Sequence, residues 1–195
     1  ALFTIRSLTP IPSTYGDIAR ALLKMIMKAP NVYFVCDSYM SPSIKDSERS
    51  ARGVTSTHIE ITGANQRCPR HFDEALKDAK FKTALLLFLL DEWSKNKYSA
   101  IIGTSVIHYS VGHNMYTISQ VDNKVEKRQV NTSEILHEEA DTRIIYHLVA
   151  ISQQKAEDDE HNSQLCREAG KRYHQTKQNV IIRTEDTDIM VLLVH

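Results

Sequence analysis

Residues 31–37, Asn-Val-Tyr-Phe-Val-Cys-Asp, decide which fold this chain can adopt. Their β-branched and aromatic side chains predict a buried β-strand, and this strand ends on Asp37. In open α/β sheets, ligands bind outside the carboxyl ends of the strands. Asp37 is therefore a candidate site residue.

Two further acidic motifs accompany strands or helices. Residues 137–143 are His-Glu-Glu-Ala-Asp-Thr-Arg, and residues 184–188 are Thr-Glu-Asp-Thr-Asp between the apolar runs 179–183 and 189–194. Carboxylates gathered at one edge of a sheet repel one another unless a positive charge lies among them, and that charge is most often a divalent metal ion. The simpler alternatives are acids that favour a helix N-terminus in the first motif and turn chemistry in the second.

Spacing constrains these acids. Asp186 and Asp188 share one side of an extended backbone. On a regular helix, Glu139 and Asp141 would point about 200° apart. Either one of them precedes the helix, or Glu138 and Asp141 are the facing pair.

Composition indicates one ordinary globular domain. The 195 residues are 42% apolar and 25% charged, and the formal net charge is zero, so bulk charge gives no evidence for nucleic acid. The three cysteines are widely spaced, which disfavours a disulfide framework or a zinc ribbon. We find no apolar run long enough to cross a bilayer and no signal peptide, and we expect an intracellular protein, nuclear or cytoplasmic, without a membrane partner.

Helical periodicity predicts a helix over residues 17–28, capped by Ser13 or Thr14, and a helix over residues 72–95 that is loosened near residues 78–82. Two more helices are expected at residues 137–151 and 160–176. Residues 57–62 are expected to form a short strand or an extended edge. A strand is expected at residues 100–103, and a β-hairpin or meander at residues 105–109, 115–121 and 124–130. Alternation of strands and helices predicts an α/β fold with a mostly parallel central sheet, into which residues 104–131 are inserted.

The order of the motifs resembles the PIN-like nuclease superfamily, and within it the flap-endonuclease group of 5′ nucleases. The resemblance lies in residues 35–38 (Val-Cys-Asp-Ser), 139–142 (Glu-Ala-Asp-Thr) and 184–188. Lys45 and Arg52, seven residues apart, match the basic residues of that group's gateway helix. Nearly the whole chain is also similar to a large uncharacterised family of animal proteins, often linked to mobile elements. The expected architecture is a three-layer α/β/α PIN-like domain over residues 1–195, truncated at both ends.

This resemblance implies hydrolysis of phosphodiester bonds in DNA or RNA with two divalent ions, Mg²⁺ or Mn²⁺, about 3.5–4 Å apart. The implied catalytic and metal-binding residues are all carboxylates: Asp37, Glu139, Asp141, Asp186 and Asp188. Glu138 and Glu185 are second choices. The implied nucleic-acid contacts are Lys45, Arg49 and Arg52, on a short helix that begins near Ser43.

Three alternatives stay open. A PIN-like domain with an incomplete site would only bind nucleic acid or protein. A zinc hydrolase is a minor alternative, because residues 137–141 mimic an HExxH motif with Asp141 in place of the second histidine. The basic residues after Asp37 could form a solvated helix face, in which case the binding face moves to the stretch Arg67, Arg70, Lys77, Lys80 and Lys82.

Overall fold

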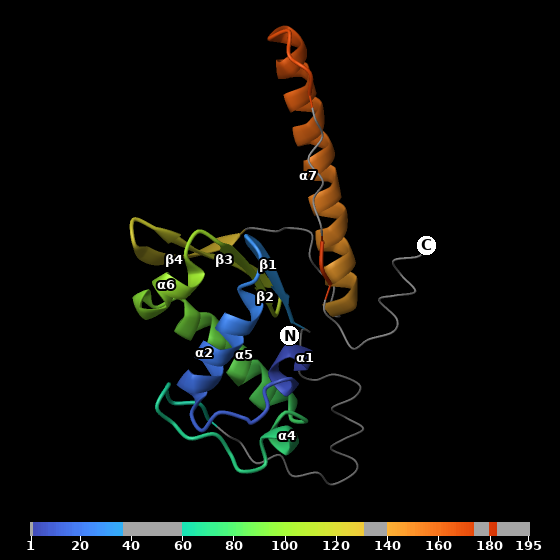
Figure 1. Ribbon diagram of the computed structural model, residues 1–195. Coiled ribbons are helices and arrows are strands. Elements are labelled where there is room, and N and C mark those ends of the chain that lie inside the picture. The colour runs from blue at the N-terminus through green and yellow to red at the C-terminus, as the bar shows by residue number, and fades with distance from the viewer. Residues whose placement is uncertain (1, 37–59, 131–139, 174–179, 183–195) are drawn as a thin grey trace. The chain divides into compact units, whose positions relative to one another are not determined.

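The computed structural model describes residues 2–36, 60–130, 140–173 and 180–182 (Figure 1). The chain divides into two units, Ala1–Ala140 and Asp141–His195. The helices of the first unit are α1 (Leu2–Arg6), α2 (Tyr15–Ile26), α4 (Phe72–Ala75), α5 (Ala79–Trp93), the 3₁₀ helix η1 (Asn96–Tyr98) and α6 (Ser99–Ile102). Its strands are β1 (Asn31–Val35), β2 (Val106–Val111), β3 (Asn114–Val121) and β4 (Lys124–Val130). Helix α7 (Ala140–Glu168) belongs almost entirely to the second unit.

The four strands form one mixed sheet in the order β1-β2-β3-β4. β1 pairs with β2 in parallel, with Val35 opposite Ser110, whereas β2–β3 and β3–β4 are antiparallel. The α/β class is thus correct, and residues 106–130 form the expected meander. A mostly parallel sheet and three layers are not confirmed, because only one of the described strand pairs is parallel.

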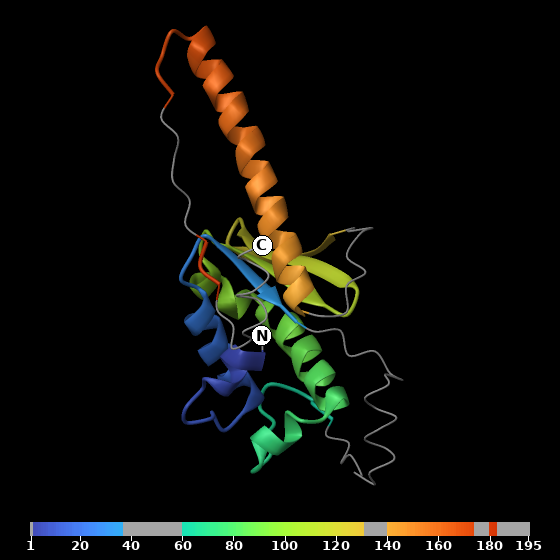
Figure 2. The same cartoon turned by 90° about the vertical axis from the view of Figure 1, so that its right-hand side faces the viewer.

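Helices α2 and α5 cover one face of this sheet in both views (Figures 1 and 2). The core lies between them, and its aromatic centre consists of Phe34, Trp93 and Tyr109, which contact one another at ring-centroid distances of 5.1–5.7 Å. The hydroxyl of Tyr109 donates to the carbonyl of Leu86 at 2.8 Å, so α5 is also tied to β2 by a buried hydrogen bond.

Local chemistry explains the start of α2. The Thr14 hydroxyl accepts a hydrogen bond of 3.2 Å from the backbone N–H of Asp17, as the predicted cap requires. The backbone N–H groups of Tyr15 and Gly16 donate to the carbonyls of Gln66 and Ala64. A neighbouring loop therefore satisfies donors that a helix leaves without intrahelical partners.

The predicted helix over residues 72–95 is interrupted, as expected, but slightly earlier than predicted. α4 ends at Ala75 and α5 begins at Ala79, where the Asp78 carboxylate accepts from the N–H of Phe81 at 2.9 Å. This cap starts a new helix and lets Phe81 and Leu85 face the core.

Three expected elements differ. The residues of the predicted strand 100–103 belong to helix α6, except Gly103, which follows it. The helix ends with a hydrogen bond of 2.8 Å from the Gly103 N–H to the Ser99 carbonyl, and Ile102 is buried. Residues 140–151 and 160–168 of the two predicted helices lie in one continuous helix, α7, because no glycine or proline interrupts residues 152–160, and this helix ends at Glu168. Residues 60–62 are not part of a strand; instead the Gln66 side chain accepts from the N–H of Thr62.

Helix α7 ends in a Schellman motif. The N–H of Lys171 donates to the carbonyl of Cys166 at 2.7 Å, and the N–H of Gly170 donates to Arg167 at 3.1 Å. Gly170 has φ +64°, a left-handed conformation that glycine adopts without steric cost.

Among the described helices, none combines the length and apolar composition that a bilayer crossing requires.

Candidate functional site

Most of the predicted site lies outside the described residues. This holds for Asp37, Glu139, Asp186 and Asp188, for the second choices Glu138 and Glu185, and for the basic residues Lys45, Arg49 and Arg52. Asp141 is described for its backbone alone, as the second residue of α7. The convergence of these acids therefore stays a prediction, and the described structure bears on the elements that lead into them.

The strand that leads to Asp37 has the predicted character. β1 is parallel to β2, and its last residues Phe34 and Val35 are buried together with Cys36. The backbone N–H of Cys36 donates to the Ser110 hydroxyl of β2 at 3.4 Å. The chain is thus held by the sheet up to the residue that precedes Asp37, at the carboxyl edge of a parallel pair.

Aromatic side chains pack against the end of β1. The ring of Phe34 meets Trp93 edge-on at 5.2 Å, and the indole of Trp93 is itself held by the carbonyl of Ala19. Burial, followed by contact with Cys36, raises the pKa of Tyr109 well above its usual range. Tyr109 therefore stays a neutral hydrogen-bond donor at all physiological pH values, and the sheet edge rests on a packed, uncharged core.

The residue types of the three acidic motifs suit a hard cation. The one soft ligand next to Asp37 in the sequence, Cys36, is buried and hydrogen-bonded to Tyr109 in the core. Magnesium and manganese prefer carboxylate oxygens and water, which are the groups that the three acidic motifs supply. Within the described ranges, no three His, Cys, Asp or Glu side chains are grouped to hold a metal ion.

Helix α7 contains Asp141, whereas Glu138 and Glu139 lie outside the described residues, so the two geometries expected for residues 137–143 both stay predictions. Two basic side chains follow one turn apart: Arg143 is 1% exposed and His147 is 7% exposed. A buried guanidinium keeps its charge and needs polar partners, so Arg143 is a structural or site residue rather than a solvated one.

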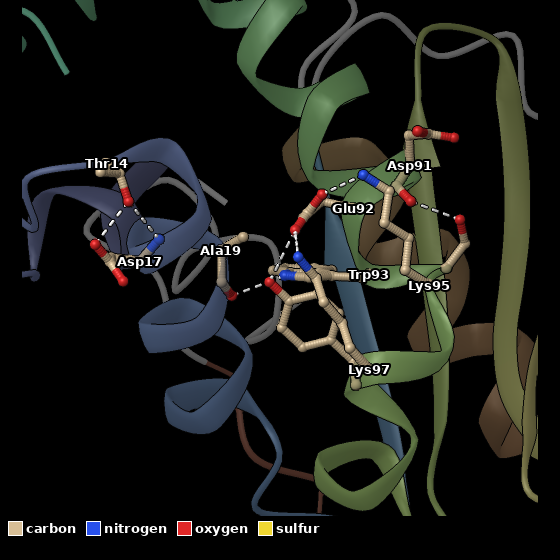
Figure 3. Close-up of polar contacts among 10 residues, drawn as sticks. Thr14, Asp17, Ala19, Asp91, Glu92, Trp93, Lys95 and Lys97 are labelled. Atoms are coloured by element: carbon tan, nitrogen blue, oxygen red, sulfur yellow. Dashed lines mark hydrogen bonds and ion pairs between the residues drawn. The ribbon is translucent and has the colours of Figure 1, made fainter. Parts of the chain in front are cut away.

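The sequence interpretation missed a buried ionic cluster at the end of α5 (Figure 3). Glu92 is fully buried, and its carboxylate accepts from Lys95 at 2.5 Å, from Lys97, and from the Tyr98 hydroxyl at 3.1 Å. Burial alone would raise the pKa of Glu92, but the two lysines outweigh burial and hold this pKa below its usual range. We define the lysine pair as Lys95 and Lys97. Its only sequence signal is the i,i+3 spacing of Glu92 and Lys95.

A second polar feature lies on the sheet face opposite Tyr109. Tyr33 of β1 stacks on His108 of β2, with ring centroids 4.3 Å apart and an interplanar angle of 9°. Burial lowers the pKa of His108, so this imidazole is neutral at physiological pH. A neutral, stacked histidine indicates packing rather than charge-based recognition.

The chain was compared with models of protein families, with curated proteins and with solved structures, and none of the three comparisons found a match.

Proposed function

We propose that the chain is a divalent-metal-dependent nuclease that hydrolyses phosphodiester bonds in DNA or RNA. The observation that carries this proposal is the anchoring of Cys36 at the carboxyl edge of the parallel pair β1–β2, one residue before Asp37. An acid that follows such a strand belongs to the edge at which α/β proteins bind their ligands. Asp141 lies in a helix, as expected for part of the second motif.

Each acidic residue has a proposed role. The carboxylates of Asp37, Glu139, Asp141, Asp186 and Asp188 would hold two Mg²⁺ or Mn²⁺ ions directly or through water. When bound, these ions supply charge neutralisation at the phosphate and a water molecule of lowered pKa.

The protein's own contribution is to bring like charges together on a preformed support. Repulsion between neighbouring carboxylates lowers the stability of the fold, and the packing of Phe34 of β1 against Trp93 can offset this loss. Lys45, Arg49 and Arg52 would contact phosphates of the bound strand, because their spacing places them on neighbouring turns of a helix.

The proposal is tested by cleavage of labelled single-stranded and duplex DNA and RNA in Mg²⁺, Mn²⁺, Zn²⁺ or a chelator. We expect cleavage in Mg²⁺ or Mn²⁺ and none in the chelator. Changing Asp186 and Asp188 to Asn should lower the rate by about 10²-fold or more. Asp122→Asn, an exposed change in the β3–β4 turn, is the matched control and should leave the rate unchanged.

The failures are distinguishable. Binding without cleavage in any metal would replace the nuclease by a binding module. Cleavage that requires zinc and survives the double Asn change would indicate the zinc hydrolase. If the double Asn variant cleaves in Mg²⁺ as fast as the Asp122→Asn control, Asp186 and Asp188 are not part of the site.

A further inference from the structure

We propose that the lysine pair, Lys95 and Lys97, is a binding site for a phosphate of the nucleic-acid backbone. The inference rests on the proposed function for the identity of this ligand. It concerns the surface at the end of α5, which is separate in the sequence from all three acidic motifs. The observations that carry it are charge, exposure and fixed geometry.

Charge is the first observation. One carboxylate, Glu92, serves two ammonium groups, so the cluster has a charge of +1 +1 −1, or +1 in total. The hydrogen bond to Glu92 raises the pKa of Lys95, and the pKa of Glu92 is lowered, so both stay ionised at neutral pH. Burial raises the pKa of Tyr98, which stays neutral. The cluster therefore retains one positive charge, the complement of one phosphodiester.

The surrounding charged groups offset one another. Asp91 pairs with Lys127 of β4 at 3.4 Å, and it also attracts Lys95 electrostatically. Arg20 and Asp17 of α2 act on the Tyr98 hydroxyl with opposite signs. Counting Lys127 and Asp91 together with Lys95, Lys97 and Glu92 leaves the total charge of the group at +3 −2, or +1.

Exposure is the second observation. The side chains of Lys95 and Lys97 are 50% and 46% exposed, while the carboxylate that binds them is 0% exposed. An ammonium group has three N–H donors, and Glu92 uses only part of them. The remaining donors can reach solvent or a ligand.

Fixed geometry is the third observation. Lysine side chains are flexible, and ordering them on binding costs free energy. Here Glu92 has already ordered both ammonium groups on one buried carboxylate (Figure 3). The adjoining residue Asn96 is in turn fixed, because its side-chain oxygen accepts from the N–H of Val125 in β4 at 2.9 Å. A phosphate oxygen would therefore meet preorganised donors.

The test measures binding of a labelled oligonucleotide by anisotropy, in chelator, so that no cleavage is needed. The site variant combines Lys95→Gln, Lys97→Gln and Glu92→Gln, which leaves no buried carboxylate without a partner and changes the net charge by −1. The control variant combines Lys24→Gln and Lys28→Gln, two exposed lysines at the end of α2, and changes the net charge by −2. If only the net charge of the protein matters, the control variant should lose more oligonucleotide affinity. If the lysine pair binds a phosphate, the site variant should lose more affinity.

We expect the site variant to weaken binding at low salt and to reduce the slope of log affinity against log salt by roughly 0.7–0.9, the contribution of one phosphate contact. A loss in the control as large as in the site variant would overturn the proposal. So would equal binding of polyglutamate through the same lysines, which would indicate an acidic protein partner.

A second variant protects the test against unfolding. Lys97→Gln alone keeps Lys95 on Glu92 and should give part of the same loss, with a melting temperature close to that of the wild type. An unchanged salt slope in both Lys97→Gln and the triple variant refutes the site. If the wild type itself binds no oligonucleotide, the proposed function fails, whereas wild-type binding with an unchanged site variant refutes only this inference.

Discussion

The indole nitrogen of Trp93 donates a hydrogen bond of 2.8 Å to the backbone carbonyl of Ala19, and both residues are fully buried (Figure 3). This contact fixes α5 against α2. Because Phe34 packs edge-on against Trp93, the same contact supports the strand that precedes Asp37. The integrity of the proposed nuclease edge therefore depends on a residue far from the acidic motifs.

Trp93→Phe should lower the free energy of unfolding by about 1–3 kcal/mol, since it removes a buried hydrogen bond and leaves a gap against Ala19. Urea denaturation measures this loss. Leu87→Ala, on an exposed position of the same helix, should change stability by only about 0.5 kcal/mol. Equal losses for the two variants would show that the indole contact contributes nothing specific.

Gly16→Ala should destabilise the fold by about 1–3 kcal/mol. An added Cβ would lie 3.0 Å from both the Cβ and the carbonyl oxygen of Ala64, and the carbonyl is held by the N–H of Gly16 itself. The steric cost outweighs the gain in helix propensity of about 1 kcal/mol. Gly63→Ala is the matched control, because its Cβ would meet no atom within 4 Å. A stabilised Gly16→Ala protein in thermal melts would contradict this close approach.

Glu92 should make folding stability depend on acid pH. Its pKa is lower in the folded chain than its ordinary value of about 4.3, so its contribution is fully present above that value and is lost as pH falls through the lower, folded pKa. Urea denaturation between about pH 5 and pH 2 should therefore show a steeper loss for the wild type than for Glu92→Gln. Glu74→Gln, which removes an exposed pair with Lys77, should keep the wild-type slope. Parallel curves for the wild type and Glu92→Gln would exclude this role.

Millimolar Mg²⁺ or Mn²⁺ should raise the melting temperature, because an ion that binds only the folded chain stabilises it by mass action. Changing Asp186 and Asp188 to Asn should stabilise the metal-free protein by removing like charges, and should abolish the response to metal. Differential scanning fluorimetry measures both effects. A wild-type melting temperature that neither ion changes would contradict the proposed metal centre.

Short-range chemistry made several elements predictable. The Thr14 cap, an interruption of the helix close to Asp78 and the meander could be predicted because a cap or turn depends on a few adjacent residues. The two-residue turn at Asp122 and Asn123 adopts φ values of 49° and 61°, which these residue types tolerate better than most. For the candidate site, the sequence predicted that Asp37 follows a buried strand, and β1 confirms the strand.

Long-range packing decided the rest. A short apolar run such as residues 100–103 fits a strand or a helix, and only the burial of Ile102 and the bond between Gly103 and Ser99 selected α6. The parallel register of Val35 with Ser110 joins residues 75 positions apart, so no local pattern contains it. Glu92 looks like a surface acid in the sequence. In the folded chain it is fully buried, next to the buried Trp93, and binds two lysines that follow the end of α5.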